Sequence, residues 1–238
     1  MKKLIKRLIH SLGYDLHRLN VNTWPEFQLF QSLKKFEINL VLDIGANEGQ
    51  FATEIRTAGY KGQIISYEPL SDAHNKAAQA AKRDKYWIVH PQAAIGDYDG
   101  NVEINISGNS VSSSVLPMTE THSEAALNSA YIGTENVPIH RLDTIATKYL
   151  SPEKNIFIKI DTQGFEWKVL DGATETLKNA KGVLCEMSLV PLYNGQHLWG
   201  DMLNRFESEG FTLWAIQRGF TDPRDGRSLQ INAIFFRL

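Results

Sequence analysis

The sequence predicts an α/β fold, a doubly wound and mostly parallel sheet with helices on both of its faces. Five short runs are apolar at successive positions, which is typical of strands buried on both faces. Segments of helical period separate these runs, and such alternation indicates parallel strands joined by right-handed crossovers. The five expected strands cover residues 40–44, 64–67, 87–89, 156–160 and 183–185.

Two further strands are expected at the C-terminus, over residues 211–216 and 231–238. The segment GFTDPRDGRS joins them, and it is too short and too rich in turn residues to form a crossover helix. We therefore expect these two strands to pair antiparallel, which brings the sheet to seven strands.

The length and composition favour one domain. A chain of 238 residues with 42% apolar side chains can bury one sizeable core. We assign residues 39–238 to this domain and residues 1–38 to a helical extension. Residues 97–142 interrupt the alternation, because Asp99-Gly100 predicts a hairpin turn before the alternating VEINI, and a Ser-rich and then a polar stretch follow. This segment is expected to be an insertion over one edge of the sheet.

The charge and the cysteine content argue against several classes of protein. A formal net charge of -2 gives no field that would attract nucleic acid, so no nucleic-acid partner is expected. Cys185 is the single cysteine, so no intrachain disulfide can form, and the cytoplasm is the expected compartment. No apolar run is long enough to span a bilayer. The oligomeric state cannot be predicted from these features.

Residues 1–18 show a basic amphipathic pattern. MKKLIKRLIHSLGYDLHR carries Lys2, Lys3, Lys6 and Arg7 among Leu and Ile at helical spacing, and Lys6 and Arg7 interrupt the apolar region that a signal peptide needs. Three interpretations stay open: a helix docked on the body, a peripheral helix on the inner face of an anionic membrane, or a disordered arm. A second helix is expected in TWPEFQLFQSLKKFEINL.

A glycine-rich turn follows the first expected strand. Asp43, Gly45, Asn47 and Gly49 alternate there, before a segment of helical character at 51–58. Glycine lets a backbone approach a ligand closely, and the N-terminus of a helix offers unpaired N–H groups. A pyrophosphate binder would carry G-x-G-x-x-G, whereas Asn47 stands in the place of the second glycine. An NAD-dependent oxidoreductase stays an alternative, and Asn47 argues against it.

An acidic residue ends the second expected strand. Glu68 lies in SYEP, about twenty residues beyond the glycines, where a carboxylate in a nucleotide-binding fold accepts hydrogen bonds from both ribose hydroxyls. The glycine turn and Glu68 together predict one ligand site at the carboxyl edge of the sheet. We also expect Ala94 to contact this ligand.

Three segments resemble one known family. The pattern D-x-G-x-N-x-G at residues 43–49 resembles the first motif of class I methyltransferases. Together with YEP at residues 67–69 and the more specific KIDTQGFEWKVLDGA at residues 159–173, it makes the chain similar to the FkbM-type methyltransferases over residues 41–185. The resemblance implies the seven-stranded class I fold, S-adenosylmethionine as cofactor, and O-methylation of a sugar, glycan or secondary metabolite.

The resemblance also indicates how the turn binds the cofactor. The methionine carboxylate, ammonium and sulfonium of S-adenosylmethionine would lie at the turn, and Asp43 would either lie near the ammonium or order the loop. The expected cofactor-binding residues are Asp43, Gly45, Asn47, Gly49, Glu68 and Ala94.

Four side chains are candidates for removing the proton of the acceptor hydroxyl. Asp161 is the first choice, since it ends an expected strand at the edge where ligands bind, although a helix cap has the same pattern. Glu166 either contacts substrate or stabilises a first helical turn. His122 is a base if the insertion closes over the acceptor, and a solvated loop residue otherwise. Glu186, at the end of the fifth expected strand, is the remaining carboxylate.

Two alternatives concern catalysis itself. Where the family often has Glu, this chain has Gln163, so no catalytic carboxylate is expected there, and a non-catalytic cofactor-binding scaffold at a membrane stays open. No H-E-x-x-H, paired cysteine or EF-hand spacing is present, so no bound metal is expected. A magnesium ion held by scattered carboxylates is the alternative.

Overall fold

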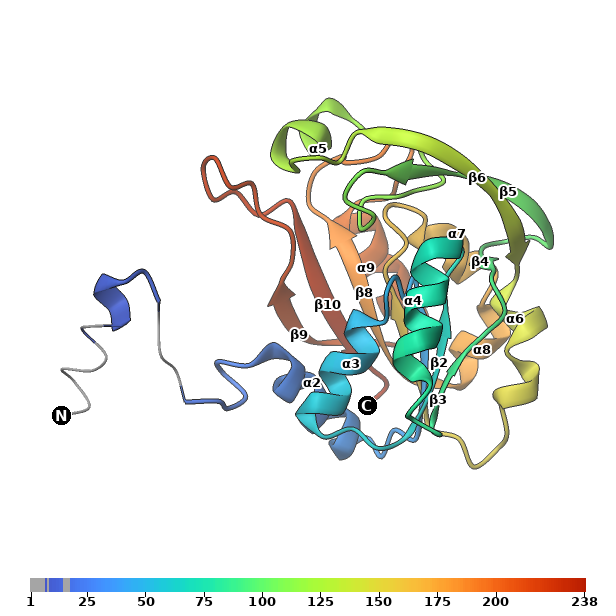
Figure 1. Ribbon diagram of the computed structural model, residues 1–238. Helices are drawn as coiled ribbons and strands as arrows, with labels where there is room; N and C mark the ends of the chain where they lie inside the picture. The colour runs from blue at the N-terminus through green and yellow to red at the C-terminus, as the bar shows by residue number, and fades with distance from the viewer. Residues whose placement is uncertain (1–6, 8, 15–17) are drawn as a thin grey trace.

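The computed structural model describes residues 7, 9–14 and 18–238 and is built around one central sheet (Figure 1). Five of its strands run parallel, and the C-terminal strand β10 is antiparallel to both of its neighbours. This confirms the predicted seven-stranded, mostly parallel sheet. In spatial order the strands are β3 (Trp87–Val89), β2 (Gln63–Tyr67), β1 (Leu40–Ile44), β7 (Ile156–Ile160), β8 (Ala180–Ser188), β10 (Gln230–Phe236) and β9 (Thr212–Arg218).

The two central strands, β1 and β7, are buried along their whole length, which explains their apolar sequences LVLDI and IFIKI. Each sequence contains one charged residue. The register of the two strands places Asp43 directly opposite Lys159. The middle of the sheet therefore holds a buried pair of opposite charges just before the carboxyl edge.

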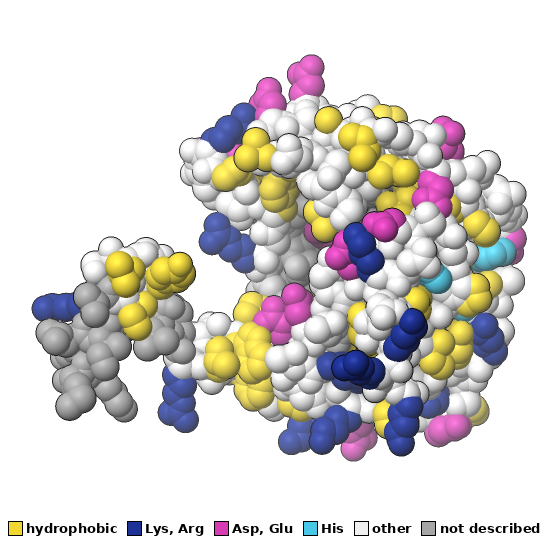
Figure 2. All heavy atoms as spheres, in the orientation of Figure 1, with side chains coloured by type: hydrophobic (Ala, Val, Ile, Leu, Met, Phe, Trp, Pro, Cys, Tyr) yellow, Lys and Arg dark blue, Asp and Glu magenta, His cyan; other side chains and the backbone are white. Residues whose placement is uncertain are grey.

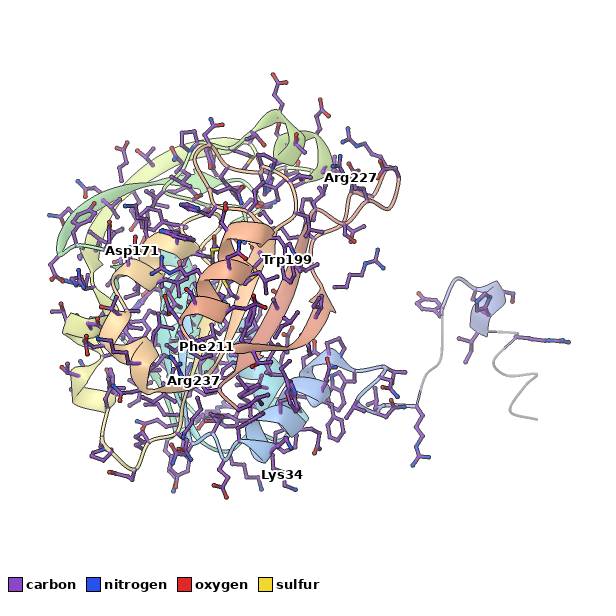
Figure 3. All side chains as sticks on the ribbon, turned by 180° about the vertical axis from the view of Figure 1, so that it is seen from behind. Lys34, Asp171, Trp199, Phe211, Arg227 and Arg237 are labelled. Atoms are coloured by element: carbon purple, nitrogen blue, oxygen red, sulfur yellow. The ribbon has the colours of Figure 1, made fainter. Side chains whose placement is uncertain are left out.

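Helices cover both faces of the sheet. One face carries α2 (Pro25–Lys35), α3 (Gln50–Ala58) and α4 (Ser71–Ala81), in front in Figure 1. The other face, turned to the viewer in Figure 3, carries five helical segments. These are α6 (Leu142–Ile145), the 3-10 helix η1 (Thr147–Tyr149), α7 (Glu166–Asp171), α8 (Thr174–Asn179) and α9 (Trp199–Ser208).

The insertion forms a second, smaller sheet. Its strands are β4 (Ala94–Ile95), β5 (Gly100–Ser107) and β6 (Tyr131–His140), in the order β4-β6-β5, and α5 (Glu120–Ala125) lies between β5 and β6. Figure 1 shows this sheet arching over the end of the central sheet where β8 ends. The expected strand VEINI lies within β5. The polar stretch expected in the insertion is instead β6, much of which is exposed and whose middle carries the polar residues Thr134, Glu135 and Asn136.

The predicted extension divides into two unlike parts. Much of the expected basic helix of residues 1–18 lies outside the described residues; positions 9–11 are helical, and the described part stands apart from the body (Figures 1 and 3). By contrast, Leu29 and Leu33 of α2 are buried in a cluster with residues of α3, β1 and β10. The second part of the predicted extension, α2, therefore packs as part of the domain core.

Among the described residues, no helix has the length and apolar character needed to cross a membrane.

Candidate functional site

A cavity of about 560 Å³ lies at the carboxyl edge of the central sheet. The insertion bounds it on one side and the start of α2 on the other, and Figure 2 shows the hollow between them. Seven of the ten predicted site residues line it, and the other three do not. The lining residues are Gly45, Asn47, Glu68, Ala94, His122, Asp161 and Glu186; those outside the lining are Asp43, Gly49 and Glu166.

The turn after β1 approaches the end of β7 closely. Gly45 has φ +74°, and a Cβ there would lie 1.8 Å from the backbone oxygen of Asp161, so no other residue fits. The N–H groups of Gly45 and Ala46 donate to the carbonyl of Tyr67, at 3.0 and 3.1 Å. The turn is therefore fixed between the ends of β2 and β7, with its backbone toward the cavity.

Glu68 closes the other side of this turn. Its Oε2 accepts a hydrogen bond from the N–H of Asn47 at 2.8 Å, and its Oε1 accepts one from the N–H of Leu70 at 2.9 Å. Burial raises the pKa of Glu68 to about 7, and the two backbone bonds oppose that shift. A carboxylate has about four acceptor positions, so two remain for a ligand.

The cavity wall contains polar atoms without a partner. Oδ1 of Asn47 and the hydroxyl of Tyr67 are buried and make no hydrogen bond with the described residues. Both residues line the cavity, where Leu70, Ala94 and Ile95 form an apolar wall. Buried polar groups are normally paired, so these two atoms fit a ligand that has both polar groups and an apolar ring. S-Adenosylmethionine, with its ribose, ammonium and adenine, meets this description.

Asp43 lies beneath the turn and does not line the cavity. Its Oδ2 accepts a hydrogen bond from the hydroxyl of Ser66 at 2.8 Å, and its Oδ1 lies 3.5 Å from Nζ of Lys159. Burial raises the pKa of Asp43, and the Lys159 charge opposes that rise. Of the two roles expected for Asp43, the structure supports the ordering of the loop.

Lys159 is a site residue that sequence reasoning missed. Its Nζ donates to the carbonyl of Gly45 at 2.7 Å and lies 3.4 Å from Oδ2 of Asp161. Burial alone would lower its pKa, but the carboxylates of Asp161 and Asp43 outweigh burial and raise it. The signal that could have found Lys159 is a lysine inside the otherwise apolar run IFIKI.

Gly49 lets two elements of the domain pack closely. It precedes α3 with φ +89°, and a Cβ there would lie 2.7 Å from the ring of Trp87. Trp87 begins β3, so the glycine lets the start of α3 come close to that strand. The structure thus gives Gly49 a packing role, and its contact with the cofactor stays a prediction.

Two carboxyl groups meet at one carboxamide beyond the turn. Nε2 of Gln163 donates to Oδ1 of Asp161 at 2.8 Å and to Oε2 of Glu186 at 2.7 Å. Gln230 donates to the same Oε2 of Glu186 at 2.7 Å, and the Tyr193 hydroxyl donates to Oε1 of Gln163 at 2.9 Å. Burial, and then the charge of Asp161, raise the pKa of Glu186 well above its usual range, which favours its protonated form.

Glu166 stabilises its own turn and lies outside the cavity lining. Its Oε1 accepts hydrogen bonds from the N–H groups of Thr162, at 2.9 Å, and Gly164, at 3.1 Å. Burial raises its pKa to about 7. Its acceptor atom is used by backbone N–H groups of the turn before α7, so of the two roles expected for Glu166 the structure supports the stabilising one.

His122 is buried, which excludes the alternative of a solvated loop residue. It lies in α5, 2% exposed, between the rings of Tyr193 and Phe220, and it lines the cavity. Nε2 lies 3.0 Å from the hydroxyl of Ser112, and Nδ1 has no partner among the described residues. Burial lowers the pKa of His122 to about 4, so its imidazole is neutral at pH 7.

Within the described part of the chain, no group of three or more His, Cys, Asp or Glu side chains has an arrangement that would hold a metal ion.

Comparisons with known proteins support a methyltransferase. Residues 43–213 match the Methyltransferase FkbM domain. No curated protein matches the chain. A Klebsiella pneumoniae protein assigned as an O-methyltransferase has a similar structure: TM-score 0.52 at 10% identity, with 99% of this chain and 88% of that chain covered. The magnesium protoporphyrin IX methyltransferase of Synechocystis PCC 6803, with bound S-adenosylmethionine, gives 0.45 at 12% identity, covering 100% of this chain and 97% of that chain.

Proposed function

The chain belongs to the FkbM family of S-adenosylmethionine-dependent methyltransferases, and from this premise we propose that its acceptor is a hydroxyl oxygen of a sugar, glycan or related metabolite. The observation that carries the proposal is the lining of the cavity beyond the glycine turn. Carboxylates accept hydrogen bonds, and carboxamides and protonated carboxyl groups both donate and accept them, as a molecule rich in hydroxyls requires. The lining residues of this kind are Asp161, Gln163, Glu186, Gln217, Gln230 and Asn232.

Four of the lining residues are proposed to hold the cofactor. S-Adenosylmethionine, when bound, supplies an electrophilic methyl group. The remaining acceptor positions of Glu68 suit the ribose hydroxyls, and Oδ1 of Asn47 is an acceptor without a partner among the described residues. Gly45 lets the backbone come close, and Ala94 adds apolar surface. These contacts orient the cofactor at the carboxyl edge of β1 and β2.

Asp161 is proposed to accept the proton of the acceptor hydroxyl. It lines the cavity with its side chain 33% exposed, and Gln163 and Lys159 hold its two oxygens on the side away from solvent. Glu186, when protonated, can donate a hydrogen bond to a neighbouring acceptor hydroxyl. His122, neutral and with Nδ1 free of partners among the described residues, is the second candidate base.

A methylation assay with isotope-labelled cofactor tests this proposal. The full chain is incubated with a panel of nucleotide sugars, free saccharides and lipid-linked glycans, with total RNA as a competitor class. We expect label in one saccharide, located on a hydroxyl oxygen by mass spectrometry. Label on nitrogen or in RNA would contradict the proposed acceptor. Tight cofactor binding without transfer to any saccharide would favour the non-catalytic scaffold.

A further inference from the structure

The N-terminal segment leaves the body at the mouth of the cavity. A local turn ends it, in which the Thr23 hydroxyl donates to the carbonyl of Arg18 at 2.6 Å. Helix α2 starts directly after the turn, and its residues Pro25, Glu26 and Leu29 line the cavity. We propose that the segment of residues 1–24 binds an anionic membrane surface, so that the cavity opens toward the lipid and takes an acceptor anchored there.

The charges of the chain are divided unevenly, and the division favours this partner. Residues 1–18 contain five cations and one carboxylate, a net +4, whereas the whole chain has a net charge of -2. The remaining residues therefore carry a net -6. Anionic lipids should therefore attract the N-terminal segment more strongly than the body, which sets the orientation of the molecule on the membrane.

The described part of the N-terminal segment exposes apolar side chains to solvent. The exposed fractions are 68% for Leu12, 71% for Tyr14, 64% for Leu19 and 43% for Val21. Figure 2 shows hydrophobic side chains on this segment and on the adjoining part of the body. Leu and aromatic side chains beside basic ones are typical of helices that lie in the headgroup region. Adjacent apolar and cationic groups fit a membrane surface better than a purely polar partner.

The opposite rim of the cavity is also apolar. Val111 of the insertion lines the cavity and is 51% exposed. Leu127, which is 83% exposed, directly follows the lining residue Ala126. Apolar side chains therefore lie on both sides of the mouth. The acceptor class that follows, a glycan or other hydroxyl compound attached to a lipid, rests on the proposed function.

Two carboxylates at the mouth of the cavity oppose its contact with an anionic membrane. Glu26 and Glu54 line the mouth, and the charge of Glu26 contributes, after burial, to a raised pKa of Glu54. An anionic surface repels both groups. We therefore expect the attraction to come mainly from the basic residues of the segment, and replacing those residues is the direct test.

Vesicle binding of the full chain provides that test. We expect sedimentation with phosphatidylcholine vesicles that contain about a quarter phosphatidylglycerol, and little with phosphatidylcholine alone. Binding should weaken as salt rises from about 0.05 M to about 0.5 M. Replacing Lys2, Lys3, Lys6 and Arg7 by Glu should weaken it by at least about a hundredfold, since each cation near the surface contributes roughly a fivefold factor.

A matched variant controls for the change in net charge. Replacing Lys61, Lys82, Arg83 and Lys85 on the body by Glu alters the net charge equally and should leave most of the binding intact. For the apolar contribution, Leu19→Ser should weaken binding by about tenfold, whereas Leu238→Ser, at a still more exposed residue of the body, should not. Thermal unfolding and S-adenosylhomocysteine affinity of each variant check that the body is folded.

Three results would overturn the proposal. The first is equal binding to neutral and anionic vesicles, and the second is unchanged binding of the N-terminal charge variant. The third is the absence of vesicle binding together with a dimer, seen by light scattering, that this variant abolishes. Failure of the proposed function is distinguishable. Normal vesicle binding with no methyl transfer to any hydroxyl would contradict the function alone. Transfer to free saccharides without vesicle binding would contradict the docking alone.

Discussion

At the scale of single residues, the site is organised by charges buried between the two central strands. Lys159 lies between Asp43, which is fully buried, and Asp161, which faces the cavity. One cation thus stabilises two carboxylates, and the same ammonium group fixes the carbonyl of Gly45. Removing one partner of such a group leaves a buried charge uncompensated, so these residues act together.

Asp161→Asn tests the proposed base. We expect cofactor affinity to change little, because Asp161 lies beyond the Glu68 end of the cavity, and turnover to fall by about a hundredfold or more, because a positioned base contributes that much. Steady-state kinetics with the acceptor found in the panel measures this. Asp225→Asn, in the β9–β10 connection, is the matched control. Unchanged turnover of Asp161→Asn would leave His122 as the base.

Glu68 predicts how cofactor binding depends on pH. Its pKa of about 7 lies above the usual value of 4.5, so protonation favours the folded state, and this contribution to stability is lost as pH rises from about 4.5 to about 7. Hydroxyls of the cofactor require the ionised form as acceptor. We therefore expect the affinity for S-adenosylhomocysteine to fall as pH decreases from about 8 to about 6, with proton release on binding, measured by calorimetry.

Two variants isolate the contribution of Glu68. Glu68→Gln should weaken binding at about pH 8 and remove most of the pH dependence. Glu166 also has a pKa of about 7 but lies outside the cavity, so Glu166→Gln should retain the dependence. Loss of the dependence in Glu166→Gln, but not in Glu68→Gln, would assign it to the α7 turn.

At the scale of elements, the turn between β1 and α3 is the most constrained segment of the site. Gly45 and Gly49 have positive φ angles but are needed for different reasons. Gly45 makes room for the backbone of Asp161, whereas Gly49 makes room for the ring of Trp87. The turn is therefore held against β7 at one glycine and against β3 at the other.

Gly45→Ala should lower the free energy of unfolding far more than the same substitution at a glycine of similar φ that has no close neighbours. Gly195 has φ +80° and nothing within 4 Å of an added Cβ, so Gly195→Ala should cost only about 1 kcal/mol of backbone strain. For Gly45→Ala we expect a loss of at least about 3 kcal/mol, together with loss of cofactor binding, because backbone atoms must move. Urea denaturation and calorimetry measure both. Equal losses in the two variants would contradict the close approach of the turn to β7.

At the scale of the whole molecule, α2 is part of the domain and the segment before it is not. Leu33 is fully buried with residues from α3, β1 and β10, whereas Leu12 is 68% exposed. Both residues lie within the predicted extension. The body of the protein thus begins about where α2 begins, and the basic segment is left to bind a partner.

Leu33→Ala and Leu12→Ala measure this boundary. Truncating a buried leucine removes packing and leaves a cavity, so Leu33→Ala should lower the free energy of unfolding by about 2–5 kcal/mol. Leu12→Ala should change it by less than about 0.5 kcal/mol, since its side chain is exposed. Urea denaturation followed by tryptophan fluorescence makes the comparison. A loss below about 1 kcal/mol for Leu33→Ala would place α2 outside the cooperative unit.

The sequence alone determined the sheet and the ligand class. Strands buried on both faces have continuous apolar runs, and the turns that join them have characteristic residues. Both signals lie within short segments, so they could be recognised without knowing which segments pack together. The motifs are also short segments, so their order along the chain was enough to indicate the family and S-adenosylmethionine. Strand β6 escaped recognition because its middle residues, Thr134, Glu135 and Asn136, are polar, and because it pairs outside the central sheet, with β4 and β5.

Only the tertiary structure decided which side chains of the motifs face the cavity. Asn47 and Asp161 line it, whereas Asp43 and Glu166 are turned to the buried charge and to the α7 turn. The role of Lys159 exists because the register of β1 and β7 joins residues more than a hundred positions apart. Periodicity along the chain specifies whether a residue is buried, but its hydrogen-bond partner depends on the segment that packs beside it.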